Sequence, residues 1–197
     1  SNAWVECCNK MNMVVVPSTF TKNVVRRSGM LKRKIIVVPE WFNENIADKS
    51  KIKTLDFENI DTDFNYLIVS TLTSPDPDND RKNIVNTLKW LLEKHKDDSN
   101  VGVVLKTSLG KGTKKDLIET KKHLKAALPE YDMSKLSIYL LHGNMDTDEI
   151  AALYHEEKIN CLVSATRGEG YGLPLIEAAA SGIPIIATNW SGHLEFL

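Results

Sequence analysis

The sequence contains few cysteines and no long hydrophobic run. Cys7, Cys8 and Cys161 are too few and too unevenly spaced for a disulfide framework or a zinc site, so we expect a reduced, cytoplasmic setting. No apolar stretch approaches the about 20 residues that a membrane-spanning helix needs, and no secretory signal is visible. These absences predict a cytoplasmic protein without a transmembrane segment, and leave room for peripheral attachment of a longer form to a membrane.

Neither sign of charge dominates. The chain has 25 Lys and Arg against 26 Asp and Glu, a net charge of −1, and no basic stripe interleaves with aromatic residues. This balance argues against nucleic acid as a partner. With 197 residues, of which 42% are hydrophobic, the composition is that of a globular protein with one full domain and part of another.

The predicted first strand of the main domain, residues 66–69, lacks a glycine fingerprint after it. Its continuation reads YLIVSTLTSP, which argues against a nicotinamide-dependent Rossmann oxidoreductase. Three aspartates follow at alternate positions, but Arg81 and Thr87 stand where a calcium loop needs Gly and Glu. We therefore expect turn chemistry here and no metal site.

The glycines gather instead in NCLVSATRGEGYGLPLIEAAASGIPIIAT, residues 160–188. An apolar run at 161–163 predicts a buried strand, in which Cys161 is a core residue. Glycines at alternate positions then predict a tight loop, Pro174 suits the first helical position, and Gly182 ends the helix before a second strand at 185–186. A strand, a loop, a helix and a strand make one half of a parallel α/β sheet.

The start of this helix predicts an anion site, because free backbone N–H groups and the helix dipole attract phosphate or carboxylate. Glu169 precedes the helix and Glu177 lies one turn inside it. Carboxylates beside such a site accept hydrogen bonds from hydroxyl groups, such as those of ribose or hexose. The alternative interpretation is a tight turn with two surface glutamates.

The rest of the chain alternates strand and helix patterns. Strands are predicted at 13–16, 35–38, 66–69, 101–105 and 138–141. Helices are predicted at 21–27, directly after Asp80 with an apolar face over 84–92, and over about 115–128, and a capping box of Asp146 and Glu149 starts a further helix. We expect Ser18 and Asp80 to cap the helices that follow them. Arg81 and Lys82 would then fall in the first turn of a helix, where a bound anion explains them and an exposed basic pair is the alternative. The predicted fold is an α/β, Rossmann-like parallel sheet with helices on both faces, which binds ligands at the carboxyl ends of its strands.

The segment GEGYGLPLIEAAASGIPIIAT resembles the donor-site signature of the retaining GT-B glycosyltransferases of the group 1 family, with Glu169 and Glu177 at the family's spacing. The resemblance implies that Glu169 is the catalytic residue and holds hydroxyls of the donor sugar, and that Glu177 holds the ribose. It also implies that a stretch of backbone faces the diphosphate, made of Gly170, Tyr171, Gly172 and Leu173.

The resemblance extends to the basic pair. Lys82, in Arg81-Lys82-Asn83, matches a family lysine on the diphosphate, whereas the position of a family arginine falls near Thr71, where this chain has none. Either Arg81 substitutes for it from the longer loop, or the phosphate is held more weakly. Met145 would border the nucleotide base.

For the whole chain, the resemblance implies a donor domain over residues 61–197, truncated at its C-terminal end. Residues 1–60 would be a tag remnant (Ser-Asn-Ala), a βαβ remnant of the acceptor domain and a linker. The implied function is retaining, metal-independent and cofactor-free hexosyl transfer from a nucleotide-diphosphate sugar to an acceptor, which could be a glycan, a lipid or a small molecule. The alternatives are another GT-B enzyme such as a sugar-nucleotide epimerase, or a non-catalytic nucleotide-sugar-binding module. We expect this fragment alone to be inactive, because most of the acceptor domain is missing.

Overall fold

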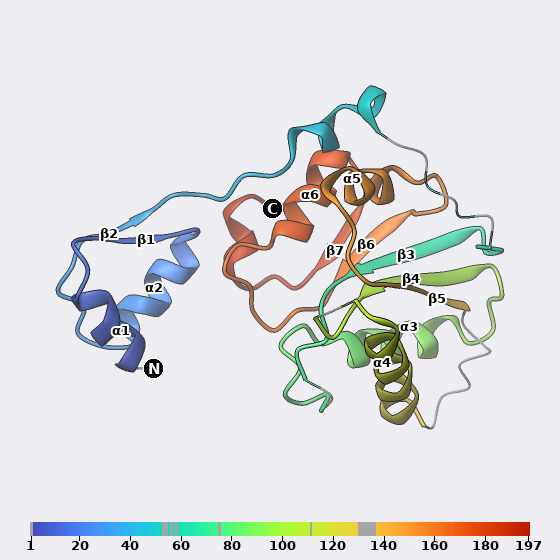
Figure 1. Cartoon of the computed structure of the whole chain (residues 1–197), viewed down its shortest axis with the longest axis horizontal. Helices are drawn as coiled ribbons and strands as arrows, with labels where there is room; N and C mark the ends of the chain where they lie inside the picture. The colour runs from blue at the N-terminus through green and yellow to red at the C-terminus, as the bar shows by residue number, and fades with distance from the viewer. Residues whose placement is uncertain are drawn as a thin grey trace.

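The computed structural model describes residues 2–52, 55, 57, 59–74, 76–110, 112–129 and 137–197 and contains two parallel sheets (Figure 1). The first belongs to a small N-terminal unit, in which helix α1 (Asn2–Asn9) precedes strand β1 (Val14–Val16), helix α2 (Thr19–Arg27) and strand β2 (Ile35–Val37). β1 and β2 pair in parallel, so this unit is the predicted βαβ. Two 3-10 turns, η1 (Glu44–Ala47) and η2 (Lys49–Lys51), lead from it toward the second sheet.

The second sheet has five parallel strands in the order β5-β4-β3-β6-β7. They are β3 (Phe64–Val69), β4 (Val101–Thr107), β5 (Ser137–His142), β6 (Cys161–Ser164) and β7 (Ile185–Ala187). The chain adds strands first on one side of β3 and then on the other. The order therefore switches between β3 and β6, and in open parallel sheets ligands bind in the crevice at the carboxyl ends of the strands at such a point.

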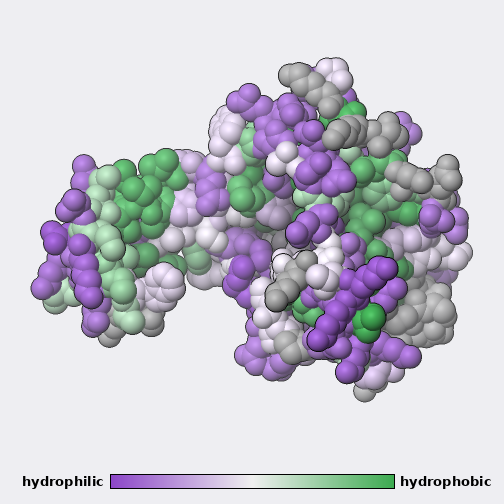
Figure 2. All heavy atoms as spheres, viewed as in Figure 1, coloured by the Kyte–Doolittle hydropathy of each residue, from purple (hydrophilic) through white to green (hydrophobic). Residues whose placement is uncertain are grey.

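Helices cover both faces of this sheet, as the sequence predicted. α3 (Ile84–His95) and α4 (Lys114–Ala127) lie on one face, and α5 (Thr147–His155) and α6 (Leu173–Ser181) on the other (Figure 1). Alternate residues of a strand point to opposite faces, so Leu67 joins the core under α5 and α6 while Ile68 joins the core under α3 and α4. The exposed lysine-rich face of α4 forms part of the hydrophilic surface in Figure 2.

The predicted helix starts hold at two of three places. Ser18 caps α2 by accepting the N–H of Thr21, and Asp146 forms a full capping box with Glu149 at α5. The prediction for Asp80, by contrast, placed the start of α3 too early. α3 begins only at Ile84, because Asn83 adopts a left-handed conformation (φ 58°) that cannot continue a helix.

Asp80 nevertheless supports this helix from a distance. Its fully buried carboxylate accepts the N–H of Ile84 at 2.8 Å and the hydroxyl of Thr73 at 2.5 Å. Arg81 and Lys82 therefore lie in the turn before α3 and not in its first helical turn, which corrects the sequence-based placement. The hydrogen bonds of the buried Asp80 carboxylate thus stabilise this turn, which follows the carboxyl end of β3.

The stretch predicted as a linker packs in part against the large sheet. Ile46 is fully buried and Ile60 is almost so, and both belong to the core under α5 and α6. Residues 53, 54, 56 and 58 of this stretch lie outside the described part of the chain. The division of the chain at residue 60 stays a prediction.

Candidate functional site

Two loops meet at the crevice between β3 and β6. In the loop after β6, the N–H of Arg167 donates to the carbonyl of Arg81, in the loop after β3, at 2.9 Å. In the opposite direction, the side-chain amide of Asn83 donates to the carbonyl of Ala165 at 3.0 Å. These bonds join segments more than 80 residues apart in the sequence. They bring the basic pair after β3 beside the glycine loop after β6.

Glu169 and Lys82 form an ion pair at this meeting point. The Lys82 ammonium donates to both carboxylate oxygens of Glu169, at 2.7 and 3.0 Å, and the Arg81 guanidinium lies 3.2 Å from one of them. The side chains of Glu169 and Lys82 are only 10% and 17% exposed, whereas that of Arg81 is half exposed. Arg81 also donates to the carbonyl of Gly168. The resemblance assigned Lys82 to the diphosphate and Glu169 to the donor sugar, and the structure shows the two side chains bonded to each other.

This contact sets the charge of Glu169. Burial raises the pKa of the carboxyl, but the hydrogen bonds and charge of Lys82, a hydrogen bond from Thr166 and the charge of Arg81 outweigh burial and hold the pKa below its ordinary value of 4.5. Glu169 is therefore an ionised, acceptor-only group at neutral pH.

The lowered pKa of Glu169 predicts a contribution to acid stability. A carboxyl whose pKa falls on folding stabilises the folded state above its unfolded pKa, and the contribution disappears as the pH falls through the folded pKa. The stability advantage of the wild type over Glu169→Gln should therefore be full above about pH 4.5 and shrink at lower pH. Urea unfolding at a series of acidic pH values measures it, with Glu6→Gln, exposed on α1, as control. An advantage that is constant with pH would contradict the assignment.

Glu177 has a different environment. It is half-buried on α6, and the Tyr154 hydroxyl of α5 bonds to its carboxylate at 3.1 Å and to the carbonyl of Pro174 at 3.1 Å. Burial raises the pKa of Glu177, and the bond from Tyr154 opposes part of that rise. Burial and the charge of Glu177 raise the pKa of Tyr154 well above its ordinary value, so the phenol keeps its proton. Sequence analysis missed this pairing, because the spacing between Tyr154 and Glu177 gives no signal of it.

The glycine loop presents backbone to the crevice. Gly172 has φ 105°, which favours glycine, and its carbonyl accepts the N–H groups of Leu175 and Ile176 at the start of α6. Because α6 begins at Leu173, Pro174 takes the second helical position and not the predicted first. The ring of Tyr171 is buried against Phe196, with centroids 5.0 Å apart, so this residue offers the crevice its backbone.

Ser191 and Gly192 support the same loop from behind. The Ser191 hydroxyl accepts the N–H of Glu169 at 2.6 Å and donates to its carbonyl at 2.7 Å, and the N–H of Gly192 reaches that carbonyl at 3.1 Å. Ser191 is buried with φ 104°, an unusual conformation for a residue with a side chain. Sequence analysis missed the role of Ser191 and Gly192, which contact the loop from a distant part of the sequence.

The N-terminal unit contacts the loop from the other side. The hydroxyls of Ser18 and Thr21 donate to the carbonyl of Gly170, at 2.6 and 3.0 Å. The carboxylate of Glu195 accepts the N–H and the hydroxyl of Thr19 at the start of α2, where the helix dipole favours a negative charge. The glycine loop therefore lies between β6 and the N-terminal unit.

A polar pocket of about 190 Å³ opens at the carboxyl ends of β3 and β4 and the start of α6. Its lining comprises Val69, Ser70, Thr71, Lys82, Lys106, Thr107, Ser108 and Pro174. It therefore contains the predicted Lys82 and the position near Thr71 where the resemblance expects an arginine. Met145 follows β5, half-buried against the core under α5 and α6.

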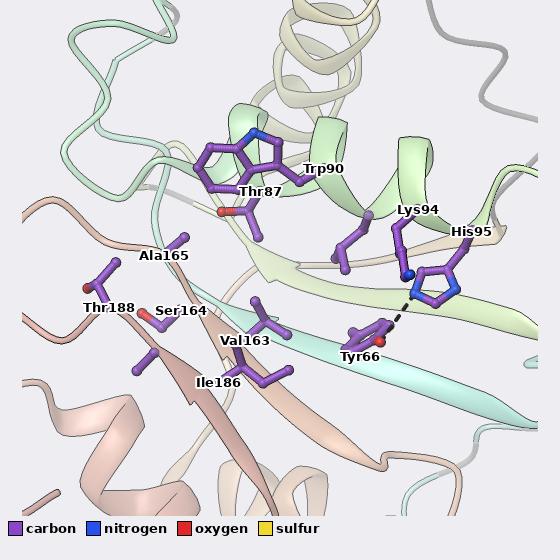
Figure 3. Close-up of a pocket in the computed structure, with 12 residues that line it drawn as sticks. Tyr66, Thr87, Trp90, Lys94, His95, Val163, Ser164, Ala165, Ile186 and Thr188 are labelled. Atoms are coloured by element: carbon purple, nitrogen blue, oxygen red, sulfur yellow. Dashed lines mark hydrogen bonds between the residues drawn. The ribbon is translucent and has the colours of Figure 1, made fainter.

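A larger cavity of about 450 Å³ lies against the face of the sheet that α3 covers, between α3 and strands β3, β6 and β7 (Figure 3). Trp90 and Thr87 of α3 face Val163 and Ile186 of the strands, and the Tyr66 hydroxyl lies 3.2 Å from the Nε2 atom of His95. None of the residues predicted to bind substrate lines it. We therefore place the candidate site at the smaller pocket, where charged groups and a helix start converge.

Comparison with known proteins identifies a family and a fold that this chain resembles. The family model described as "Glycosyl transferases group 1" matches residues 115–197, which include the glycine loop and both glutamates. Among solved structures, the Anabaena protein HepE in complex with UDP and glucose is 18% identical, with a TM-score of 0.70, over 100% of this chain and 50% of that one. The five-stranded unit has the GT-B fold.

Two other solved structures share this fold. An E. coli structure described as trehalose-6-phosphate bound with UDP-2-fluoro glucose is 10% identical, with a TM-score of 0.68, over 98% of this chain and 49% of that one. The pneumococcal O-GlcNAc transferase GtfA in complex with UDP and GlcNAc is 21% identical, with a TM-score of 0.58, over 98% of this chain and 33% of that one. This chain thus spans about half or less of the length of these proteins. A comparison with curated proteins finds no match. Among the helices of the described residues, none has the length and apolar character to cross a membrane.

Proposed function

We propose that this chain is the donor-binding part of a retaining GT-B glycosyltransferase, which transfers a hexosyl group from a nucleotide-diphosphate sugar to an acceptor. The observation that carries the proposal is the convergence of Lys82, Glu169 and the start of α6 at the switch point of the sheet, with Glu177 one turn further along α6. Residues 61–197 form the donor domain in this scheme, and residues 1–60 the end of the acceptor domain.

The diphosphate would lie at the start of α6, where N–H groups and the helix dipole favour an anion. Lys82 and the backbone from Gly170 to Leu173 hold it in place of a metal ion or cofactor. Arg81 contributes from the rim, because its side chain is half exposed and bonded to Gly168. The names of the matched structures support a nucleotide sugar as ligand, since they specify UDP with glucose, UDP-2-fluoro glucose, and UDP with GlcNAc.

The two glutamates would take different hydroxyl groups. Glu169 is ionised and faces the crevice from the loop, so it suits the hydroxyls of the transferred sugar. Glu177 is oriented by Tyr154 within α6 and suits the ribose. Met145, in the loop after β5, would border the base. The proposal includes a cytoplasmic location.

A second candidate is a non-catalytic module that binds the same nucleotide sugar. The observation that favours it is the missing arginine near Thr71, which weakens the expected phosphate contacts. Sugar transfer by a full-length form would separate the two functions. We propose that this chain alone binds the nucleotide sugar without turnover. Transfer needs an acceptor held in near-attack geometry, and in this scheme the chain contains only the end of the acceptor domain.

The proposal predicts binding of a nucleoside diphosphate. Calorimetry with UDP, GDP and ADP should show binding of at least one, with affinity falling as salt screens the charges. Lys82→Met should weaken it by about tenfold, the lower range for loss of a charged hydrogen bond. Lys122→Met, on the exposed face of α4, is the matched control and should leave the affinity unchanged. Failure of all three nucleotides to bind at millimolar concentration would refute the proposal.

A further inference from the structure

One cation in the polar pocket has no role in the scheme above. Lys106 is the next-to-last residue of β4 and is half-buried beside Lys82 in the pocket lining. Its ammonium donates to the neutral carbonyl of Gly143. Lys82, by contrast, donates two hydrogen bonds to the carboxylate of Glu169. The charge of Lys106 is thus the less compensated of the two.

Burial also disfavours the charged form of this lysine. Burial lowers the pKa of Lys106, and the charge of Glu149 on α5 opposes part of that change. Partial burial of an ammonium without a close counter-ion is unfavourable, and buried charges in proteins are usually paired. An anion in the pocket would supply that pairing.

Two hydroxyl groups in the same pocket also lack partners. Ser70 Oγ and Thr107 Oγ1 are buried and make no hydrogen bond to any described residue, and Thr107 as a whole is 1% exposed. Buried polar atoms are seldom left unsatisfied, and those that are call for a ligand or a functional explanation. Phosphate oxygens accept hydrogen bonds from hydroxyl groups and from ammonium groups.

The register of the sheet places Lys106 close to the position near Thr71 at which the resemblance expects an arginine. β3 and β4 are parallel neighbours, and Lys106 pairs with Val69. The two residues that follow Val69 are Ser70 and Thr71, and both line the pocket with Lys106. Lys106 at the end of β4 and Thr71 after β3 therefore line one pocket.

We infer that Lys106, together with the hydroxyls of Thr107 and Ser70, is the second phosphate-binding group of this site. Lys106 takes from β4 the role that an arginine near Thr71 would have taken from β3. The inference rests on the proposed function, because it assigns a further residue to the same diphosphate. It explains how a site can hold a diphosphate although one expected cation is absent and Lys82 shares its charge with Glu169.

The test uses Lys106→Gln and Lys106→Arg. Gln keeps a donor for the Gly143 carbonyl but removes the charge, whereas Arg keeps both. With the diphosphate that the wild type binds, calorimetry should show about tenfold weaker binding for Lys106→Gln and a change within a few-fold for Lys106→Arg. The binding of Lys106→Gln should also depend less on salt. Lys122→Gln is the control, and Thr107→Val should weaken binding several-fold.

The outcomes separate this inference from the proposed function. If the wild type binds and Lys106→Gln binds equally well, the inference is overturned and the proposed function stands. If Lys106→Gln weakens the nucleoside monophosphate as much as the diphosphate, Lys106 acts by holding the Gly143 loop and the inference is again overturned. If the wild type binds no nucleotide, both fall. Should Lys106→Gln fail to fold by circular dichroism, unchanged binding by Thr107→Val would overturn the inference.

Discussion

Replacing Gly192 with alanine is expected to destabilise the fold and remove most nucleotide binding. A Cβ atom at this position would lie 2.1 Å from the carbonyl oxygen of Gly170 and 2.7 Å from that of Glu169. Both are backbone atoms, which cannot rotate away as the end of a side chain can. The glycine loop would have to move, and with it Glu169, the N–H groups before α6 and the contact with Ser18.

The expected magnitudes follow from that displacement. Overpacking of a tight site costs up to about 3 kcal/mol, and the backbone clash here places Gly192→Ala at that upper end. Nucleotide affinity should fall by roughly 100-fold, because a shift of about 1 Å in a binding group can cost that much. Urea unfolding and calorimetry measure the two effects.

Gly182→Ala is the matched control for this prediction. Gly182 ends α6 with φ 82°, but a Cβ there meets no atom within 4 Å. Its left-handed conformation should cost about 1 kcal/mol of stability, and nucleotide affinity should stay unchanged. If Gly192→Ala behaved like Gly182→Ala in both measurements, the loop would not depend on the packing of residues 191–192.

The second large effect separates the two glutamates. Glu177→Gln should weaken bare nucleotide and nucleotide-sugar by similar factors, roughly ten- to hundred-fold, because a charged hydrogen bond to the ribose is lost in both. Glu169→Gln should weaken the nucleotide-sugar alone. Glutamine is the informative substitution, since it keeps the size and removes the charge and one acceptor.

The ion pair with Lys82 also predicts how Glu169→Gln changes the affinity for bare nucleotide. Once the carboxylate is gone, the Lys82 ammonium no longer divides its hydrogen bonds between Glu169 and a phosphate. Bare nucleotide should therefore bind Glu169→Gln as well as the wild type or more tightly. Paired titrations with nucleotide and nucleotide-sugar on both variants measure this. Equal weakening of both ligands by Glu169→Gln would show that the assigned roles are wrong.

The pairing of Tyr154 provides an internal check on Glu177. If the Tyr154 hydroxyl orients the carboxylate toward the ribose, Tyr154→Phe should reproduce part of the loss seen in Glu177→Gln, for both ligands. It should leave the ratio between nucleotide and nucleotide-sugar unchanged. A change in that ratio would indicate that Glu177 also reaches the sugar.

Much of this protein was readable in the sequence. The apolar runs, the glycine loop and the helix caps depend on near neighbours, and these gave the parallel α/β fold, the start of α5 and the placement of Glu169 and Glu177 around α6. The start of α3 was placed too early because the left-handed turn at Asn83 and the buried bonds of Asp80 have no local pattern.

The site itself was decided by the tertiary structure. Lys82 meets Glu169 across 87 positions of sequence because the strand order puts β3 beside β6. Lys106 lines one pocket with Thr71 because β4 is the other neighbour of β3. Ser191 and Tyr154 reach the two glutamates by the same kind of long-range packing. Periodicity and caps record only the interactions of residues close in sequence. Which loops share a crevice, and which charges neutralise one another there, is set by the order of the strands in the sheet.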